Sequence, residues 1–181
     1  MKQNNRTVLW ITRTAVFIAL LIVAQLATAS LGNTLITGSL VNLILIVAVM
    51  TSGLACGSTA AVISPVLARL IGIGPSWILI PFIMVGNFIL VLIWHLIGNR
   101  KTAPRIVSYI IALIIGAVAK FLFLYIGIVK IAVPFILKLP AKKAAVISAS
   151  FSFPQLITAS IGGVLAIIIL PVLKKAFSEH N

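Results

Sequence analysis

Apolar runs long enough to cross a lipid bilayer dominate this chain, and they recur from Ala15 to Leu173 with only short interruptions. A membrane span needs about 20 apolar residues. Because the hydrocarbon core offers no hydrogen-bond partners, such a span must be a helix that satisfies its own backbone groups. Only 8% of the residues are charged, whereas soluble domains average about 25%. The sequence therefore predicts an all-α membrane protein in which residues 1–181 form a single integral membrane domain.

Turn-forming clusters of Gly, Asn, Ser and Pro divide the apolar sequence into segments. We predict a bundle of six transmembrane helices at residues 13–31, 35–51, 54–71, 76–97, 106–126 and 146–173. The second and third of these helices are short and are joined at Ser52-Gly53. Trp77 and Trp94 lie at opposite ends of the fourth helix, so we expect them at the two membrane interfaces.

The apolar segment at residues 128–139 does not fit this count. Joined to the fifth span it would make a helix about 50 Å long, too long to stand upright in a hydrocarbon core of about 30 Å. Pro134 and Pro140 instead favour an outer loop that carries a short surface helix.

Basic residues outnumber acidic residues by 14 to 1. In a soluble protein this balance would indicate nucleic-acid binding. Here the basic residues lie mainly at the span ends, where the positive-inside rule places both termini in the cytoplasm. Four lysines in the third outer connection break that rule: Lys130, Lys138, Lys142 and Lys143. Three explanations remain open: the topology is wrong there, the loop is translocated regardless of its charge, or the positive charge attracts an anion.

Lys120 lies deep in an otherwise apolar span, residues 106–126. A charge at this depth costs about 2.5–3.5 kcal/mol on insertion scales, so it indicates a function by default. The only acidic residue of the chain is Glu179, close to the C-terminus, and no span contains a carboxylate to pair with the ammonium. Lys120 must therefore bond to hydroxyls, amides and carbonyls, release its proton, or meet an anion from outside.

Other polar side chains lie in the spans at comparable depth. At 1.5 Å per residue, Asn42, Asn87, Lys120 and Gln155 lie near the midplane or in the outer half, and Arg69 lies near the outer end of the third span. A bundle with these groups gathered together would hold a pocket that opens outward. Each residue also has a plainer explanation, because buried amides can bond between helices and long cationic side chains can reach the interface.

Ala15 and Ala19 lie one helical turn apart on the first span. Patterns of small residues at this spacing let another helix approach closely in lipid. A similar run, Gly53-xxx-Gly57-xxx-Ala61, marks the third span. Packing within the chain is the more common reason for such a pattern, and docking of a partner is the alternative.

The sequence lacks the residue groups that would carry catalysis. It contains no Walker motif for ATP hydrolysis, no cluster of metal ligands, and no acid positioned to pair with His95 or His180. Cys56 is the only cysteine, which excludes an internal disulfide. We therefore expect a protein that is not an enzyme and that needs neither a cofactor nor a metal.

Several of these features occur together in a known family. The chain length, the six spans with both ends cytoplasmic, and the basic residue followed by Ala15-xxx-Ala19 resemble the substrate-binding S components of energy-coupling factor (ECF) vitamin transporters. Residues 64–87, SPVLARLIGIGPSWILIPFIMVGN, also look like the region of the third and fourth spans in such proteins. The resemblance covers nearly the whole chain and implies a multi-pass protein of the bacterial cell membrane.

The resemblance implies a passive subunit that takes a vitamin or vitamin precursor from outside with high affinity. It implies docking through Ala15 and Ala19 on a transmembrane T component, which two ATPase subunits drive. The family's pocket lies at the outer ends of the fourth to sixth helices, under the loop between the first two. Together with the intramembrane polar residues, this gives a predicted substrate site of Asn33, Asn42, Arg69, Asn87, Lys120 and Gln155.

The scarcity of acids and the cationic outer half favour a carboxylate substrate such as pantothenate. Two other functions stay open on sequence alone. One is a stand-alone secondary transporter of a small organic anion, although proton relays usually use Asp, Glu or His, and His95 is the only such residue within a span. The other is a subunit of a membrane assembly or enzyme that transports nothing.

Overall fold

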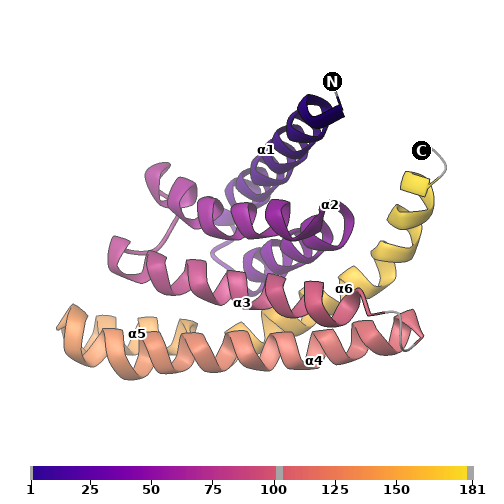
Figure 1. The fold of residues 1–181 in the computed structure, drawn as a ribbon. Coiled ribbons are helices and arrows are strands. Elements are labelled where there is room, and N and C mark those ends of the chain that lie inside the picture. The colour runs from indigo at the N-terminus through magenta and orange to yellow at the C-terminus, as the bar shows by residue number, and fades with distance from the viewer. Residues whose placement is uncertain (1, 101–103, 179–181) are drawn as a thin grey trace.

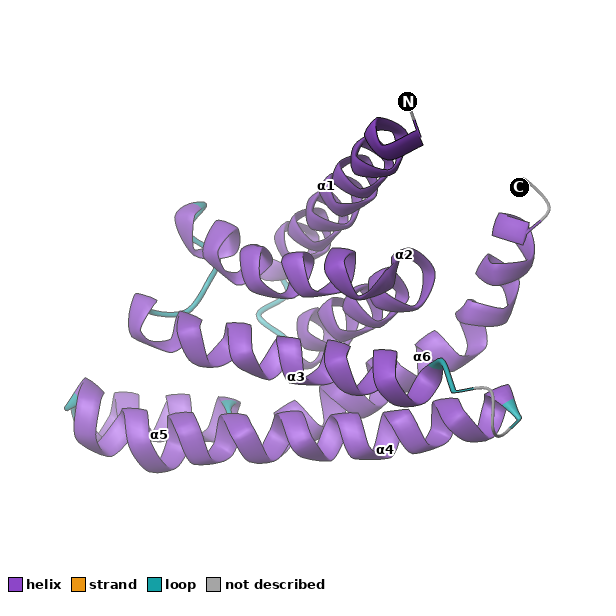
Figure 2. Cartoon of the chain, viewed as in Figure 1, coloured by secondary structure: helices purple, strands orange, loops and turns teal. Residues whose placement is uncertain are grey.

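The computed structural model describes residues 2–100 and 104–178, and within these ranges every regular element is a helix (Figure 1, Figure 2). The long helices are α1 (Lys2–Ala29), α2 (Thr34–Leu70), α3 (Ile80–Gly98), α4 (Arg105–Leu124) and α6 (Phe153–Ser178). Three shorter elements join them, namely the 3-10 turn η1 (Trp77–Leu79), the π-helix η2 (Tyr125–Leu137) and helix α5 (Ala141–Ser150). The prediction of an all-α membrane protein is confirmed to this extent.

The predicted count of six spanning helices is wrong. Among the described residues, five helical segments are long and apolar enough to cross a membrane: Arg6–Ala29, Thr34–Leu70, Trp77–Gly98, Arg105–Leu137 and Ala141–Lys175. The difference arises in α2, because this one helix takes up both short spans predicted at residues 35–51 and 54–71.

Helix α2 nevertheless turns back on itself at Gly53. This residue has φ 87° and ψ 174°, a conformation essentially restricted to glycine. A Cβ atom on Gly57 would lie 2.6 Å from Cβ of Val49, so the halves of α2 on either side of the bend pack directly against each other. Figure 1 shows the two halves side by side. The boundary expected at Ser52-Gly53 is therefore a bend within one helix, with no loop between the halves.

The outer loop predicted at residues 128–139 is also wrong. Helix α4 continues directly into η2, so that Arg105–Leu137 forms one helical segment of 33 residues. Pro134 lies inside η2 and does not end it, although it has no N–H to donate to the helix. The chain leaves η2 only at Lys138, which has a left-handed φ of 43°.

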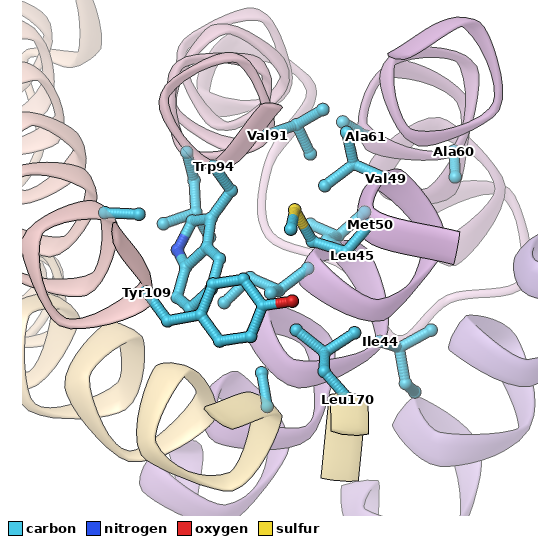
Figure 3. Packing of buried hydrophobic residues seen from close by; sticks show 14 of the residues in the cluster. Ile44, Leu45, Val49, Met50, Ala60, Ala61, Val91, Trp94, Tyr109 and Leu170 are labelled. Carbon is cyan, nitrogen blue, oxygen red and sulfur yellow. The ribbon is translucent and has the colours of Figure 1, made fainter. Parts of the chain in front are cut away.

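The bundle is centred on α2, which packs against α1, α3 and α6. Its main apolar core joins side chains from these helices and from α4, including Leu45, Val91, Tyr109 and Leu170 (Figure 3). Helix α1 packs mainly on α2 and leaves most of its own apolar surface uncovered. Such a surface is suited to contact with lipid or with another membrane helix.

The prediction that Trp94 lies at a membrane interface is wrong. Its indole is fully buried in the core, and its ring centroid lies 6.0 Å from that of Tyr109 (Figure 3). Gly116 and Gly163 make room for it, since a Cβ atom on either glycine would lie only 3.4 Å from the indole. Trp77 is half exposed, as expected for a residue at a membrane interface.

Replacing Gly53 with alanine should destabilise the protein by about 1–3 kcal/mol, because a Cβ atom strains this backbone conformation. No atom lies within 4 Å of the position that this Cβ would take, so the cost is conformational and not steric. Thermal unfolding of the detergent-purified protein measures the loss. Ser52→Ala is the control in the same bend and should change stability by less than about 0.5 kcal/mol. A Gly53→Ala variant as stable as the parent chain would contradict a requirement for glycine.

Candidate functional site

The side chain of Lys120 is buried where three helices meet. It projects from α4, is only 3% exposed, and donates hydrogen bonds from Nζ to Oδ1 of Asn42 on α2 at 2.5 Å and to Oδ1 of Asn87 on α3 at 2.7 Å. Both asparagines are buried as well. Three polar residues that the sequence placed on separate spans therefore form one cluster.

A fourth helix joins this cluster through Thr158 on α6. Nδ2 of Asn42 donates to Oγ1 of Thr158 at 3.4 Å, and Thr158 in turn donates to the backbone carbonyl oxygen of Gln155 at 3.2 Å. These bonds orient the Asn42 amide so that its oxygen faces the ammonium of Lys120. Thr158 was not among the predicted site residues, although it is a hydroxyl residue about one helical turn after the predicted site residue Gln155.

Two glycines allow α2 and α6 to approach closely at Asn42. A Cβ atom on Gly162 would lie 2.7 Å from Cβ of Asn42 and 2.7 Å from the carbonyl oxygen of Ser39. One on Gly38 would lie 2.9 Å from Cγ2 of Thr158. The absence of side chains at these two positions brings Thr158 within reach of Asn42.

Within the described part of the chain no carboxylate neutralises the Lys120 ammonium, because the only acidic residue, Glu179, lies outside it. Burying a charge without a counter-charge is costly, and here two neutral amide oxygens provide the stabilisation. An ammonium group has three N–H donors. Asn42 and Asn87 use two of them, which leaves one for a group in the space beside the lysine.

A cavity of about 520 Å³ adjoins Lys120. This volume lies within the range of about 300–1,000 Å³ that small-molecule sites occupy. Polar side chains line parts of the wall: Gln25, Thr34, Thr37, Asn42, Ser64, Ser76, Asn87, Lys120, Ser150 and Gln155. Apolar side chains line most of the rest, among them Val41, Leu79, Ile83, Leu124 and Ile147. Lys120 is the one charged side chain that lines the cavity within the residues the structure describes.

The structure brings four of the six predicted site residues to this cavity: Asn42, Asn87, Lys120 and Gln155. Gln155 is half-buried, and its Nε2 donates to the carbonyl oxygen of Ser150 at 3.1 Å. This bond ties the beginning of α6 to the end of α5. The role of these residues in binding stays a prediction.

Asn33 and Arg69 do not line the cavity but support its edge. Asn33 is exposed and caps α2, because its Oδ1 accepts a hydrogen bond from the N–H of Leu35 at 2.9 Å. Arg69 donates to the carbonyl oxygen of Gly74 at 3.4 Å, and its guanidinium lies 5.9 Å from the ring centroid of Trp77. Since Gly74 does line the cavity, Arg69 helps to hold the connection that forms part of the wall.

The two small-residue patterns have different environments. Ala15 and Ala19 are both exposed on α1, so packing among the described residues does not use them. Gly57 and Ala61 are buried in the second half of α2, where Gly57 meets Val49. The second pattern therefore serves the fold, and the first remains available for a partner.

These observations define a helical membrane protein with a cavity of the size that small-molecule sites have and one lysine in its described wall. In a comparison with protein families, residues 10–174 match the substrate-specific component of ECF transporters. The match covers most of the chain, and the chain belongs to this family. The resemblance noted in the sequence is therefore confirmed. Comparisons with curated proteins and with solved structures give no match.

Gly162→Ala should destabilise the protein by about 1–3 kcal/mol, the usual cost of overpacking, because its Cβ would meet backbone atoms of Ser39 and Leu43 at 2.7 and 2.8 Å. Gly98→Ala is the control, since the nearest atoms to its Cβ would be Cε and Sδ at the flexible end of the Met50 side chain. Thermal unfolding in one detergent compares the two variants. Equal losses would show that the approach of α2 and α6 does not depend on Gly162.

Proposed function

We propose that this chain captures a small carboxylate-bearing vitamin or vitamin precursor in the cavity beside Lys120, with high affinity, for an ECF-type importer. Membership in the family of substrate-specific components supports a substrate-binding subunit. The proposed partners are a transmembrane T component and two ATPase subunits. They would supply the energy for transport, because the chain itself has no Walker motif.

One observation carries the proposal for a carboxylate. The Lys120 ammonium lines the cavity and bonds to two neutral amide oxygens, so a bound anion would provide the missing negative charge. Hydrogen bonds to charged groups contribute about 1.5–3 kcal/mol. A contribution of this size corresponds to a preference of about 10- to 150-fold for a carboxylate over a neutral analogue.

Charges near the cavity support the same proposal. Lys130, Lys138, Lys142 and Lys143 are all exposed, on η2, on α5 and at the junction between them. Helix α5 also lines the cavity, through residues such as Ile147. A patch of one sign raises the local concentration of oppositely charged ligands. On this proposal, the lysines that break the positive-inside rule attract the substrate to an outward-facing cavity.

Pantothenate is the first candidate that we propose to test. It is a monocarboxylate, which matches the single charged side chain in the described wall. Its hydroxyl and amide groups have possible partners in the polar side chains elsewhere around the cavity, such as Thr37 and Gln155.

A stand-alone secondary transporter for a small organic anion is the alternative function. It would need a group that couples transport to an ion gradient, and such groups are usually Asp, Glu or His. His95 is the one such residue in a span, but it does not line the cavity, and its Nδ1 lies 3.4 Å from Nδ2 of Asn99 near the end of α3. Uptake into vesicles that contain no partner subunit, driven by an ion gradient, would favour this alternative.

Lys120→Met should weaken binding of the carboxylate ligand by about 10- to 150-fold, through loss of one charge-assisted hydrogen bond. Mass spectrometry of small molecules released from the purified protein identifies the ligand, and calorimetric titration of that ligand and of pantothenate measures the affinity. Lys174→Met is the control, because Lys174 lies away from the cavity and donates to the Tyr109 hydroxyl at 3.1 Å. An unchanged dissociation constant for Lys120→Met would mean that Lys120 is purely structural.

Ala15→Trp and Ala19→Trp should abolish uptake while ligand binding to the purified protein stays intact. An indole on this exposed face of α1 would hold a docking helix away. Uptake is measured in proteoliposomes that contain the T component and both ATPase subunits. Ile114→Trp, on an exposed face of α4, is the control and should transport normally. Unchanged uptake by both alanine variants would remove the proposed docking face.

A further inference from the structure

We infer that the cavity binds its ligand in one orientation, with a hydrogen-bond acceptor such as a carboxylate at the Lys120 end and a hydrogen-bond donor at the opposite end. This inference rests on the proposed function and adds the polarity and length of the ligand. We call Asn42, Asn87 and Lys120 the floor of the cavity. We call Gln25, Thr34 and Thr37 its rim.

The floor offers hydrogen-bond donors to a ligand. Lys120 has one N–H left after bonding to the two asparagine oxygens. Because Oδ1 of Asn87 accepts from Lys120, the group that this amide has available for a ligand is the Nδ2 donor. Both polar atoms of the Asn42 amide already form hydrogen bonds, since Oδ1 accepts from Lys120 and Nδ2 donates to Thr158. A group that accepts hydrogen bonds and carries negative charge fits this surface.

The rim offers hydrogen-bond acceptors. The Thr37 hydroxyl donates its single proton to Oγ1 of Thr28 at 2.7 Å, and Thr28 donates to the carbonyl oxygen of Ala24 at 2.8 Å. Thr37 therefore presents lone pairs to the cavity. Gln25 donates one N–H from Nε2 to the carbonyl oxygen of Leu21 at 3.1 Å, so its Oε1 stays available as an acceptor and its second N–H as a donor. A hydroxyl or N–H group on the ligand fits this end.

Floor and rim are separated by an apolar section of wall. Thr34 is exposed, Thr37 is half-buried and Asn42 is buried, so α2 descends from the mouth of the cavity to its floor. Thr37 and Asn42 are about 8 Å apart along the helix at 1.5 Å per residue. Val41 and Ile83 line the cavity between the two polar ends. A ligand that bridges them needs a body of this length without further charge.

The preferred substrate class is therefore an elongated monocarboxylate with a hydroxyl or amino group at its far end. A second anionic group would face the acceptor oxygens of the rim, where no cation lines the described wall. Dicarboxylates and phosphate esters are correspondingly poor ligands. Pantothenate, with one carboxylate and a terminal hydroxyl, belongs to the preferred class.

Three water-soluble probes test the two ends separately. N-(4-hydroxybutanoyl)-β-alanine has both the carboxylate and the terminal hydroxyl, and its 4-fluoro analogue carries a near-isosteric group that cannot donate. N-(3-hydroxypropyl)-4-hydroxybutanamide replaces the carboxylate with a hydroxyl. In calorimetric titrations of the full chain in lipid nanodiscs, the first should bind tightest. The fluoro probe should bind about 2- to 10-fold more weakly, and the probe without carboxylate about 10- to 150-fold more weakly.

Two conservative variants assign these differences to residues. Asn87→Asp places a carboxylate 2.7 Å from Nζ of Lys120, so the protein completes its own ion pair and the carboxylate probe loses its advantage over the diol. Asn99→Asp, an equal charge change on the exposed residue after α3, should preserve that advantage. Thr37→Val removes one of the two acceptors at the rim and should reduce only the preference for hydroxyl over fluorine. Thr51→Val, whose hydroxyl bonds to the carbonyl oxygen of Val47 at 2.7 Å, is its matched control.

The outcomes distinguish failure of the proposed function from failure of the inferred orientation. If the parent chain binds the carboxylate and diol probes equally, both the proposed function and the orientation fail. If it prefers the carboxylate but does not distinguish hydroxyl from fluorine, only the orientation is overturned. If none of the three probes shows saturable binding, the inferred ligand class is wrong, while a different carboxylate released from the purified protein would leave the proposed function standing.

Discussion

The contact between the Lys120 ammonium and two asparagine oxygens is the constraint on which this structure depends. It joins α2, α3 and α4 through hydrogen bonds, which require a defined geometry, whereas apolar packing alone is not directional. Because each asparagine amide has one acceptor oxygen, the bond to Lys120 fixes the orientation of that amide. The Nδ2 group of Asn42 then points toward α6, where it donates to Thr158. The same contact holds the Lys120 amine at the wall of a cavity, where the described chain places no carboxylate beside it.

Glycines provide the backbone geometry that makes this cluster possible. Gly53 lets α2 reverse within a single bend, so both of its halves contribute to the bundle. Gly162 and Gly38 then bring α6 against the first half of α2 at the level of Asn42. The polar cluster and the close packing around it thus depend on each other, since wider spacing would leave the amide of Asn42 without its partner on α6.

Polar residues stand out in apolar runs, and their depth follows from the rise of a helix. These signals were sufficient to predict that Asn42, Asn87, Lys120 and Gln155 lie close together, and all four line the cavity, while their role in binding stays a prediction. They were not sufficient for Arg69 and Thr158, because the rotation of each helix about its axis depends on contacts with other helices. Trp94 shows the same limit, since its burial depends on Gly116 and Gly163. Asn33 precedes α2 and serves as its N-cap. The span count differed because a single glycine conformation replaced a loop at Gly53.

The lack of a counter-charge for Lys120 within the described chain also has an electrical consequence. A protonated and empty floor carries one positive charge, whereas a floor that holds a monoanion is neutral. Moving one elementary charge through a transmembrane voltage involves about 2.3 kcal/mol per 100 mV. Any rearrangement that carried the cavity across the bilayer would therefore respond to the voltage when the cavity is empty, and would be nearly indifferent to it when the cavity is filled.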